Sequence, residues 1–393
     1  MNKKTSKPNT LLVIIKREMQ RLVKRPLYLF CMVIAPLFCA LFFTTLMSEG
    51  LPTKLPIAAV DLDKTSTSRK LLSNLNTLQQ TNITEYHNSI EAARKSMQRG
   101  EIYGFFYLPR GLSEKAQSQK QPTLSFYTNN SFMIAGSLLF KDMKTMGELA
   151  SGGAARTMLY AKGATEEQAM AILRPITINT HPLNNPWLNY SVYLSNTIVP
   201  GILSLMILMI TAFSIGVEIK ENTSKEWLKT SKYNIGTALA GKLIPQFIVW
   251  FIMGLFILTY FYGYLSYPCN SGILPMILAM VCLILASQAF GVFVFGMFPV
   301  LRLALSFTSL WGVLSFSITG FSFPVMAMHP TLQALSYLFP LRHYFLIYIN
   351  QALNGYSMSY AWTNYLALLM FMILPFFVLK NLKTALLYYK HMP

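Results

Sequence analysis

The sequence contains six apolar segments, and a long polar insert separates the first from the other five. The segments cover residues 27–47, 198–217, 243–264, 273–298, 303–321 and 361–379. Each is close to the roughly 20 apolar residues that a helix needs to cross a bilayer, and none contains Asp, Glu, Lys or Arg. A membrane barrel would instead show short segments of alternating polarity. The chain is therefore predicted to be an α-helical polytopic membrane protein with six transmembrane helices in a 1+5 order.

The distribution of positive charge predicts how the chain lies in the membrane. Lys and Arg number 8 in residues 1–26, 5 in 218–242, 1 in 299–302 and 3 after 379. The short loops of the opposite side contain one basic residue, Arg342. Because basic residues favour the cytoplasmic side, both termini and the 218–242 loop are expected in the cytoplasm. The insert of residues 48–190 is expected outside.

The net charge of +18 belongs mainly to the expected cytoplasmic faces. The insert carries 15 basic and 11 acidic residues, whereas the rest of the chain carries 18 basic and 4 acidic residues. Basic segments beside a membrane span attract anionic lipid. Membrane lipid is therefore the predicted counterpart of this charge, and nucleic acid is not expected as a partner.

A helical wheel over residues 11–24 has an apolar side and a basic side. The apolar side contains Leu11, Leu12, Ile15, Met19, Leu22 and Val23, and the other contains Lys16, Arg17, Gln20, Arg21 and Lys24. Glu18 stands at the edge of the apolar stripe. This pattern predicts an amphipathic elbow helix within residues 1–26 that lies on the cytoplasmic leaflet and turns into the first span at Pro26. A basic flank that only sets the topology is the alternative.

The insert has the pattern of a small α/β domain. Apolar runs at residues 55–60, 102–108 and 123–127 are typical of strands, and residues 66–78, 90–99 and 111–117 have helical spacing. Residues 132–162 are predicted to be helical with an interruption at Gly152 and Gly153, followed by a helix at 165–173. This long helical stretch is expected to connect the domain to the membrane. Asp61 and Asp63 are predicted to form a helix cap and turn rather than a metal site or acid/base pair.

No pattern predicts catalysis, a metal site or a cofactor. The five histidines are scattered without metal-ligand spacing. Gly236, Gly241 and Lys242 match the spacing of a phosphate-binding loop, but Leu243 replaces the Ser or Thr that binds Mg²⁺, and a membrane span follows. The chain is therefore not predicted to be an enzyme.

The absence of ionisable residues from the spans disfavours an ion-coupled carrier. Energy for uphill transport would then come from a partner protein, and the 218–242 loop is where that partner is expected to dock. Trp227 and Leu228 look exposed on a short charged helix in this loop, which suits insertion into a cleft of another protein.

Several motifs, in their order along the chain, resemble the permease subunits of type-2 ATP-binding-cassette (ABC) exporters. The resemblance is to the subgroup with a large extracytoplasmic domain between the first and second spans, and it covers nearly the whole chain. The motifs are Lys16-Arg-Glu18 through Arg25-Pro26, Pro56-Ile-Ala-Ala-Val-Asp-Leu-Asp63, Gly104 through Leu108-Pro109-Arg-Gly111, the loop from Glu218 to Thr223 with Gly241-Lys242-Leu-Ile-Pro245, and Phe323-Pro324 to Pro340-Leu-Arg-His-Tyr344.

The resemblance implies a half-transporter in a bacterial inner membrane. It would pair with a second permease, identical or related, over two ABC ATPase subunits that bind the ATP, and its outer domain would pass cargo to a periplasmic adaptor or an outer-membrane channel. In such proteins the loop after the second span forms a coupling helix. That role is carried over to Glu218, Glu221, Asn222, Thr223, Trp227 and Leu228, with Arg17 and Glu18 as neighbours. Asn222, Thr223 and Trp227 depart from the commoner Gly-Thr-type turn and leucine-rich helix.

Residues 322–360 are too apolar for a loop and too broken for a span, and the resemblance makes them re-entrant helices at an outer gate. The gate candidates are Pro324, Pro330, Pro340, Arg342 and His343. Arg342 and His343 would meet an anionic headgroup, with interfacial snorkelling as the alternative. The candidates for the translocation pathway are Asn196, Ser204 and Thr211 on the second span and Ser306, Ser309, Ser315, Ser317 and Thr319 on the fifth. Helix packing is the alternative role for these small polar residues.

The predicted function is therefore an ATP-driven export permease for a drug, a lipid or another amphipathic cargo. The main alternative is a membrane-anchored sensor or scaffold whose insert binds a ligand and whose cytoplasmic loop docks a signalling protein. The five further spans disfavour this alternative, because a sensor would not need them. A permease-like immunity or phage-receptor protein is a third interpretation.

Overall fold

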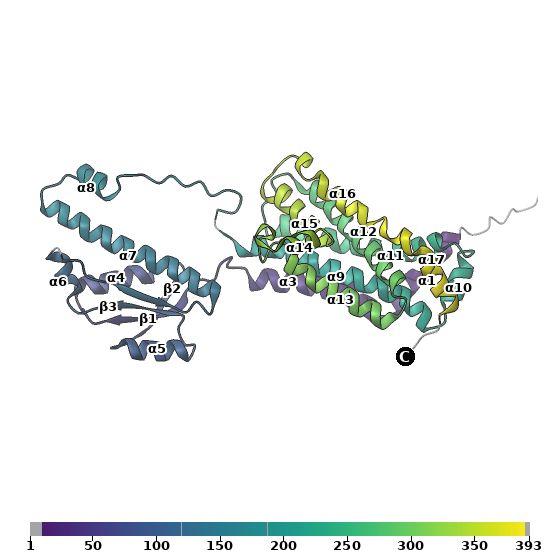
Figure 1. Ribbon diagram of the computed structural model, residues 1–393, viewed down its shortest axis with the longest axis horizontal. Helices are drawn as coiled ribbons and strands as arrows, with labels where there is room; N and C mark the ends of the chain where they lie inside the picture. The colour runs from purple at the N-terminus through teal and green to yellow at the C-terminus, as the bar shows by residue number, and fades with distance from the viewer. Residues whose placement is uncertain (1–9, 119, 187, 390–393) are drawn as a thin grey trace, which may run out of the picture. The chain divides into compact units, whose positions relative to one another are not determined.

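The computed structural model describes residues 10–118, 120–186 and 188–389, and the chain divides into two compact units (Figure 1). The insert domain comprises Leu51–Pro182, and the helical unit comprises Met1–Gly50 together with Leu183–Pro393. The two boundaries, after Gly50 and after Pro182, fall a few residues inside the predicted insert of 48–190.

Among the described residues of the helical unit, six helices are long and apolar enough to cross a membrane. They are Pro26–Leu46, Tyr190–Lys220, Ile235–Tyr264, Ile273–Met297, Leu301–Ile318 and Trp362–Tyr388. This confirms the six predicted spans and their 1+5 order. Two spans begin about eight residues earlier than predicted, at Tyr190 and Ile235, since Asn189 and Asn234 cap these helices through their side chains.

Three of the six spans are single α-helices, and the other three join two or more helical segments. The second to fifth are α9 (Tyr190–Lys220), α11 (Ile235–Thr259) with a π-helical end (Tyr260–Tyr264), α12 (Ile273–Met297) and α13 (Leu301–Ile318). The first span joins α2 (Pro26–Leu29), a π-helical turn (Phe30–Ile34) and α3 (Ala35–Leu46). The last joins α16 (Trp362–Phe371) and α17 (Leu374–Tyr388).

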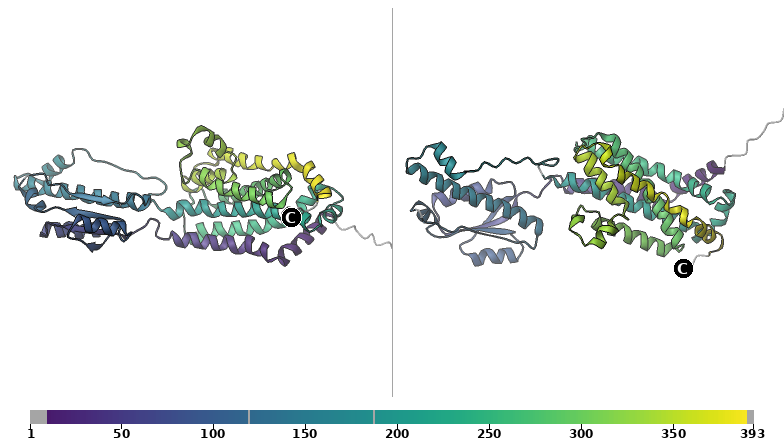
Figure 2. Two further views of the ribbon diagram at one scale, coloured as in Figure 1. Left: turned by 60° about the horizontal axis from the view of Figure 1, so that its bottom comes forward. Right: turned by 45° about the horizontal axis from the view of Figure 1, so that its top comes forward.

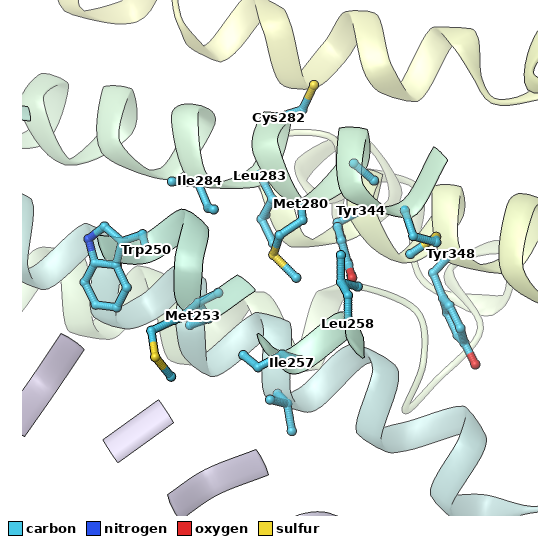
Figure 3. Packing of buried hydrophobic residues seen from close by; sticks show 14 of the residues in the cluster. Trp250, Met253, Ile257, Leu258, Met280, Cys282, Leu283, Ile284, Tyr344 and Tyr348 are labelled. Atoms are coloured by element: carbon cyan, nitrogen blue, oxygen red, sulfur yellow. The ribbon is translucent and has the colours of Figure 1, made fainter. Parts of the chain in front are cut away.

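The core of the helical unit lies around α9 and α12. Their most apolar windows are 67% and 72% buried inside the protein, compared with 22–39% for the other spans. Figure 3 shows Trp250, Met253 and Ile257 of α11 on the side of α12 that carries Met280, Leu283 and Ile284. Gly254 permits this approach, because a Cβ at that position would lie 2.7 Å from Met280 Cγ. Figure 2 shows the long helices side by side within this unit.

The segment between α13 and the last span forms two short helices, α14 (Pro330–Ser336) and α15 (Pro340–Tyr348). Pro330 and Pro340 occupy the first turns of these helices, where the missing N–H of proline costs nothing. Short 3₁₀ turns at Val325–Ala327 and Met358–Tyr360 flank them. The broken helical character matches the prediction for residues 322–360, and the depth of these helices in a membrane stays a prediction.

The insert domain is a four-stranded sheet with helices on both faces, which confirms the predicted α/β class (Figure 1). The strands β1 (Leu55–Asp61), β2 (Thr81–Tyr86), β3 (Gly104–Leu108) and β4 (Ser125–Thr128) lie in the order β2-β1-β3-β4. β1 is parallel to β2 and β3, and β4 is antiparallel to β3. The edge strand β2 was not predicted, because its sequence is largely polar and only Thr81 is buried.

Alternate residues of β1 and β3 supply the two faces of the sheet. On one face Ile57 and Phe106 pack against α4 (Ser66–Asn76), α6 (Leu112–Gln117) and α7 (Met133–Ala161). On the other face Val60 and Phe105 pack against α5 (Ile90–Gln98). This alternation is the period of two expected for a sheet buried on both faces.

The long helix α7 corrects two expectations. It runs without interruption through Gly152 and Gly153, where each glycine costs roughly 1 kcal/mol relative to alanine and the rest of the helix compensates. Its residues Leu139, Met143 and Met146 are buried on the sheet, so α7 is part of the domain core rather than the predicted connector to the membrane. The following helix, α8 (Glu166–Leu173), lies where it was predicted.

Asp61 forms the predicted turn, whereas the cap of the following helix is Thr65 rather than either aspartate. Asp61 Oδ1 accepts hydrogen bonds from the backbone N–H groups of Asp63 and Lys64, and its Oδ2 accepts one from Ser68 Oγ at 2.7 Å. Thr65 caps α4 with a reciprocal pair of hydrogen bonds to Ser68. The Asp61 carboxylate therefore holds the β1–α4 turn.

Candidate functional site: a buried charge cluster

Five charged side chains meet at one end of the helical unit. They are Arg17, Glu18 and Arg21 of α1 (Thr10–Lys24), Glu218 near the end of α9 and Lys242 in α11. We call this group the charge cluster. Its two carboxylates and its lysine are at most 1% exposed, so each depends on the others for compensation of its charge.

Glu218 is the centre of the charge cluster. Its Oε2 lies 2.9 Å from an Arg17 guanidinium nitrogen and its Oε1 lies 2.9 Å from Lys242 Nζ, while Arg21 and the Thr223 hydroxyl also bond to this carboxylate. Lys242 Nζ is in turn 2.8 Å from Glu18 Oε2. One carboxylate thus links α1, α9 and α11.

Lys242 and Gln246 complete the polar contacts beneath α1. Gln246 donates from its amide nitrogen to Glu18 Oε1 at 3.1 Å. Lys242 Nζ lies 4.8 Å from the centroid of the Trp227 ring, within the range of a cation–π interaction. The sequence motifs place Lys242 in a false phosphate-binding pattern and in the family motif of residues 241–245, and they give neither Lys242 nor Gln246 a role in coupling. The signal that would have identified this cluster is a single lysine at the edge of an apolar span, together with acidic residues on other helices that could pair with it.

The orientation of α1 corrects the expected place of Glu18. The buried face of α1 is Ile14, Glu18 and Leu22, at successive intervals of four residues, so Glu18 lies at its centre rather than at the edge of a stripe. Arg17 and Arg21 turn toward α9 instead of standing free in solvent.

Particular residues explain both the face of α1 that stays exposed and the face that packs against α11. Leu12, Met19 and Val23 remain exposed, which is the face that an interfacial helix presents to lipid. On the packed side, Gly241 lets α1 approach α11, because a Cβ at that position would lie 2.6 Å from Ile14 Cγ2. This packing accounts for the glycine of the false motif.

The short helix α10 (Ser224–Thr230) follows α9 through a tight turn. The N–H of Thr223 bonds to the carbonyl of Glu218 and the N–H of Asn222 bonds to that of Ile219, the pattern of a Schellman cap. Asn222 has φ +57°, a left-handed conformation that Asn tolerates better than most residues with a Cβ. Arg25 pairs with Glu221 across this turn at 2.5 Å.

Trp227 and Leu228 are buried within this chain, and the expectation that they are exposed for a partner was wrong. Both side chains are 0% exposed. They pack in a core with residues of α1, α9, α11, α12, α13 and α17. The reason is amphipathicity: Trp227 and Leu228 are the two large apolar residues of α10, and the face that they form packs inside the chain. Its opposite face exposes Lys225, Glu226 and Lys229.

The candidates for the translocation pathway fall into two groups. Asn196, Ser204, Thr211, Ser315 and Thr319 are buried between helices. Their contacts are those of helix packing: Ser204 pairs with Ser287 at 2.7 Å, and Asn196 accepts from the Tyr262 hydroxyl at 2.9 Å. Ser306 and Ser317 are exposed on α13, and Ser309 is partly exposed. The structure therefore does not bring these residues together around one cavity in a single chain.

The outer-gate candidates are also separated. His343 is 4% exposed, with Nε2 2.9 Å from the carbonyl of Tyr337 and Nδ1 3.3 Å from Asn364 Oδ1, so it does not face a headgroup. Arg342 is partly exposed, and it donates to the Thr319 carbonyl at the end of α13 while lying over the Tyr337 ring. Pro324 is exposed beside the 3₁₀ turn, and Pro340 is buried at the start of α15.

These features define a polytopic helical membrane protein whose short loop helix α10 is anchored in the bundle by buried charge. The sequence matches the ABC-2 family transporter proteins over residues 26–379, so the chain belongs to this family. It is thus the membrane component of an ABC transporter, a non-catalytic part of a machine that associates with an ABC ATPase subunit. No curated protein matches the chain.

Proposed function

We propose that this chain is the permease half of an ATP-driven exporter and that α10 transmits the action of the ATPase. The observation that supports this most is the anchoring of α10. Trp227 packs into a core shared by six other helices, and Glu218, at the preceding turn, is bonded to cations of α1 and α11. A displacement of α10 would therefore move several spans together, as a coupling element requires.

The proposed contact surface for the ATPase is the exposed side of α10 and its flanking turns. It contains Lys220, Glu221, Asn222, Lys225, Glu226, Lys229 and Lys232. Charges of both signs at a rim set partner orientation and association rate. In this proposal, the coupling role expected from the sequence stays with Glu221 and Asn222. The other expected residues, Trp227, Leu228, Glu18 and Arg17, would support the contact surface from inside the chain.

Affinity purification of the full chain, solubilised in detergent from its native membrane, tests the coupling surface. Lys225→Glu combined with Lys229→Glu reverses two charges on the exposed side of α10 without touching the core. Lys95→Glu combined with Lys162→Glu is the matched control, because both lysines are exposed in the insert domain. We expect an ABC ATPase subunit, with ATPase activity, to copurify with the wild type and the control and to be largely lost from the α10 variant.

Two outcomes would contradict the proposal. A folded wild type with which no ATPase activity copurifies would contradict the proposal that the chain holds its ATPase through the surface of α10. An α10 variant that retains the subunit at the level of the wild type would place the contact elsewhere on the chain.

We further propose that a second permease, identical or related, packs on the exposed face of α13. Leu303, Ser306, Leu310, Val313, Leu314 and Ser317 are all exposed there. They recur at intervals of three and four residues, which is the spacing of a helix-packing seam. Small residues such as Ser306 and Ser317 permit close helix approach in membranes. The translocation pathway would then lie between two copies, which fits the dense packing within one.

The proposed orientation has both termini and α10 in the cytoplasm of a bacterium and the insert domain outside the inner membrane, supported by the charge bias of the loops. A drug, a lipid or another amphipathic molecule is the proposed cargo. The insert domain would meet a periplasmic adaptor or an outer-membrane channel in this scheme.

A further inference from the structure

The insert domain has a crevice at a position where α/β sheets bind ligands. After β1 the chain enters α4 on one face of the sheet, and after the neighbouring parallel strand β2 it enters α5 on the other face (Figure 1). Connections that leave adjacent parallel strands on opposite faces open a crevice at the carboxyl ends of those strands. The loops after Asp61 and Tyr86 therefore diverge at this edge.

A cleft of about 570 Å³ occupies this crevice. It is lined by Asp61, Lys64, Arg69, Leu72, Ser73, Asn76, Tyr86, His87 and Asn88. These residues come from the loop after β1, the side of α4 and the loop after β2. Its volume is within the ~300–1,000 Å³ typical of small-molecule sites.

The available polar groups of the cleft are mainly hydrogen-bond donors. Lys64 and Arg69 are exposed, and neither forms an ion pair with a described residue. Arg69 uses only its Nε, which donates to the Thr65 carbonyl at 3.1 Å, so its terminal nitrogens remain available. Asn76 accepts from the Ile83 N–H through Oδ1, which leaves its amide N–H groups for a ligand.

Asp61 does not make the cleft a cation site. It is the only carboxylate of the lining, and its two oxygens already accept three hydrogen bonds from Asp63, Lys64 and Ser68. Asp61 instead holds the turn that contains Lys64, whose backbone φ is +53°. The turn fixes the position of the lysine backbone beside α4.

We propose that this cleft binds a small anion of the phosphate or carboxylate class. Lys64 and Arg69 supply the charge, and Asn76 with Ser73 supplies neutral hydrogen bonds. The ring of Tyr86 is 68% exposed and offers a face for an attached organic group. A soluble metabolite and the headgroup of an anionic lipid share this chemistry, and the experiment separates the two sources.

Isothermal titration of the purified full chain in non-ionic detergent tests the site. Inorganic phosphate and citrate are the soluble probes, and dihexanoyl-phosphatidylglycerol is the lipid probe, with dihexanoyl-phosphatidylcholine as its zwitterionic counterpart. The test variant combines Lys64→Gln with Arg69→Gln. The matched control combines Lys70→Gln with Lys95→Gln, which removes the same charge from exposed positions of α4 and α5 outside the cleft.

We expect at least one anionic probe to bind the wild type. Each lost charge-assisted contact should weaken binding about tenfold, so the test variant should bind about a hundredfold more weakly. The control should remain within a few-fold of the wild type. Hydrogen exchange should slow in the loops after β1 and β2 when the probe is present. Binding of phosphate or citrate would indicate a soluble ligand, and binding of phosphatidylglycerol alone would indicate a headgroup.

Three results would overturn the proposal: no anionic probe binds at millimolar concentration, phosphatidylcholine binds as well as phosphatidylglycerol, or both double variants lose affinity equally. The last result would mean that diffuse surface charge, not the cleft, attracts the anion. The site does not depend on the proposed export function, because the titration requires neither the ATPase nor transport.

Discussion

At the scale of single residues, Lys242 pairs with two buried carboxylates and is the cation that compensates Glu18, whereas Glu218 also pairs with Arg17 and Arg21. Removing one partner from a buried ionic group leaves uncompensated charge and typically costs about 3–5 kcal/mol. We therefore expect Lys242→Met to lower the thermal stability of the protein strongly. The midpoint of unfolding, followed by size-exclusion chromatography after heating in detergent, measures this.

The exposed pair of Arg25 and Glu221 is the control for Lys242. Both side chains are about one-third exposed, so Arg25→Gln should cost at most about 1 kcal/mol. Combining Lys242→Met with Glu18→Gln should recover part of the loss, because it removes the carboxylate that Lys242→Met leaves without a cation. If Lys242→Met were as stable as Arg25→Gln, the charge cluster would not be buried as described.

The left-handed turn at Asn222 gives a second prediction. Asn222→Gly keeps the φ of +57° without a Cβ and should leave stability within a few tenths of a kcal/mol. Asn222→Val places a β-branched side chain in that conformation and should cost about 1–2 kcal/mol. The same heating assay distinguishes them, and equal stability of the two variants would show that the turn relaxes at no cost.

Two aspartates of the insert domain should respond to pH with opposite signs. Burial raises the pKa of Asp142, although the Gln80 N–H that donates to it acts the other way. The pKa of Asp63 is lowered: burial opposes this, and hydrogen bonds from Ser113 and Thr65 outweigh it. The stability that Asp142 contributes is thus lost as pH rises through its folded-state pKa. The stability that Asp63 contributes is lost as pH falls below the ordinary pKa of an aspartate, which is ~4.

These signs predict the effects of the two amide substitutions. Asp142→Asn should stabilise the insert domain at pH 7 and lose this advantage on acidification, whereas Asp63→Asn should destabilise it at pH 7. Resistance of residues 51–182 to protease in the full-length protein, measured at pH 7 and pH 4, reports both. A destabilised Asp142→Asn at pH 7 would mean that the carboxylate charge contributes more than its burial costs.

At the scale of elements, α10 illustrates what the sequence could and could not establish. Its length and charged exposed side follow from local composition, so a short helix in the 218–242 loop was predictable. The inward direction of Trp227 depends on a pocket built by six other helices and could not be predicted from a seven-residue pattern. The placement of Glu18 beside Lys242 likewise depends on contacts more than 200 residues apart in the chain.

The anchoring of α10 gives a prediction for this element. Trp227→Ala should cost about 3–5 kcal/mol through a cavity in the shared core, so it should reduce the yield of folded protein. Trp227→Phe, which fills more of the space, should be milder. Normal folding of Trp227→Ala, measured by the heating assay, would indicate that α10 rests on the bundle rather than being packed within it.

At the scale of the whole molecule, the apolar spans and the α/β insert followed directly from hydrophobic length and periodicity. The edge strand β2 and the packed helix α7 did not, because a polar strand is stabilised by its neighbour β1 and a glycine-containing helix by the sheet beneath it. The burial of the small polar residues was the least predictable feature. Ser204 and Ser306 are chemically alike, and only the packing places one in the core and the other on the surface.

The exposed face of α13 yields the last prediction, because a permease that transports between two subunits needs a face for its partner. In a cysteine-free background, Ser306→Cys and Ser317→Cys should each form a disulfide-linked adduct on mild oxidation in native membranes. A two-fold axis that runs along α13 would bring like residues of the two copies of this helix together. Ile248→Cys, exposed on α11, is the control and should remain a monomer. An adduct with a related permease would support the same interface, whereas adducts at Ile248 alone would place the partner against α11 and leave α13 facing lipid.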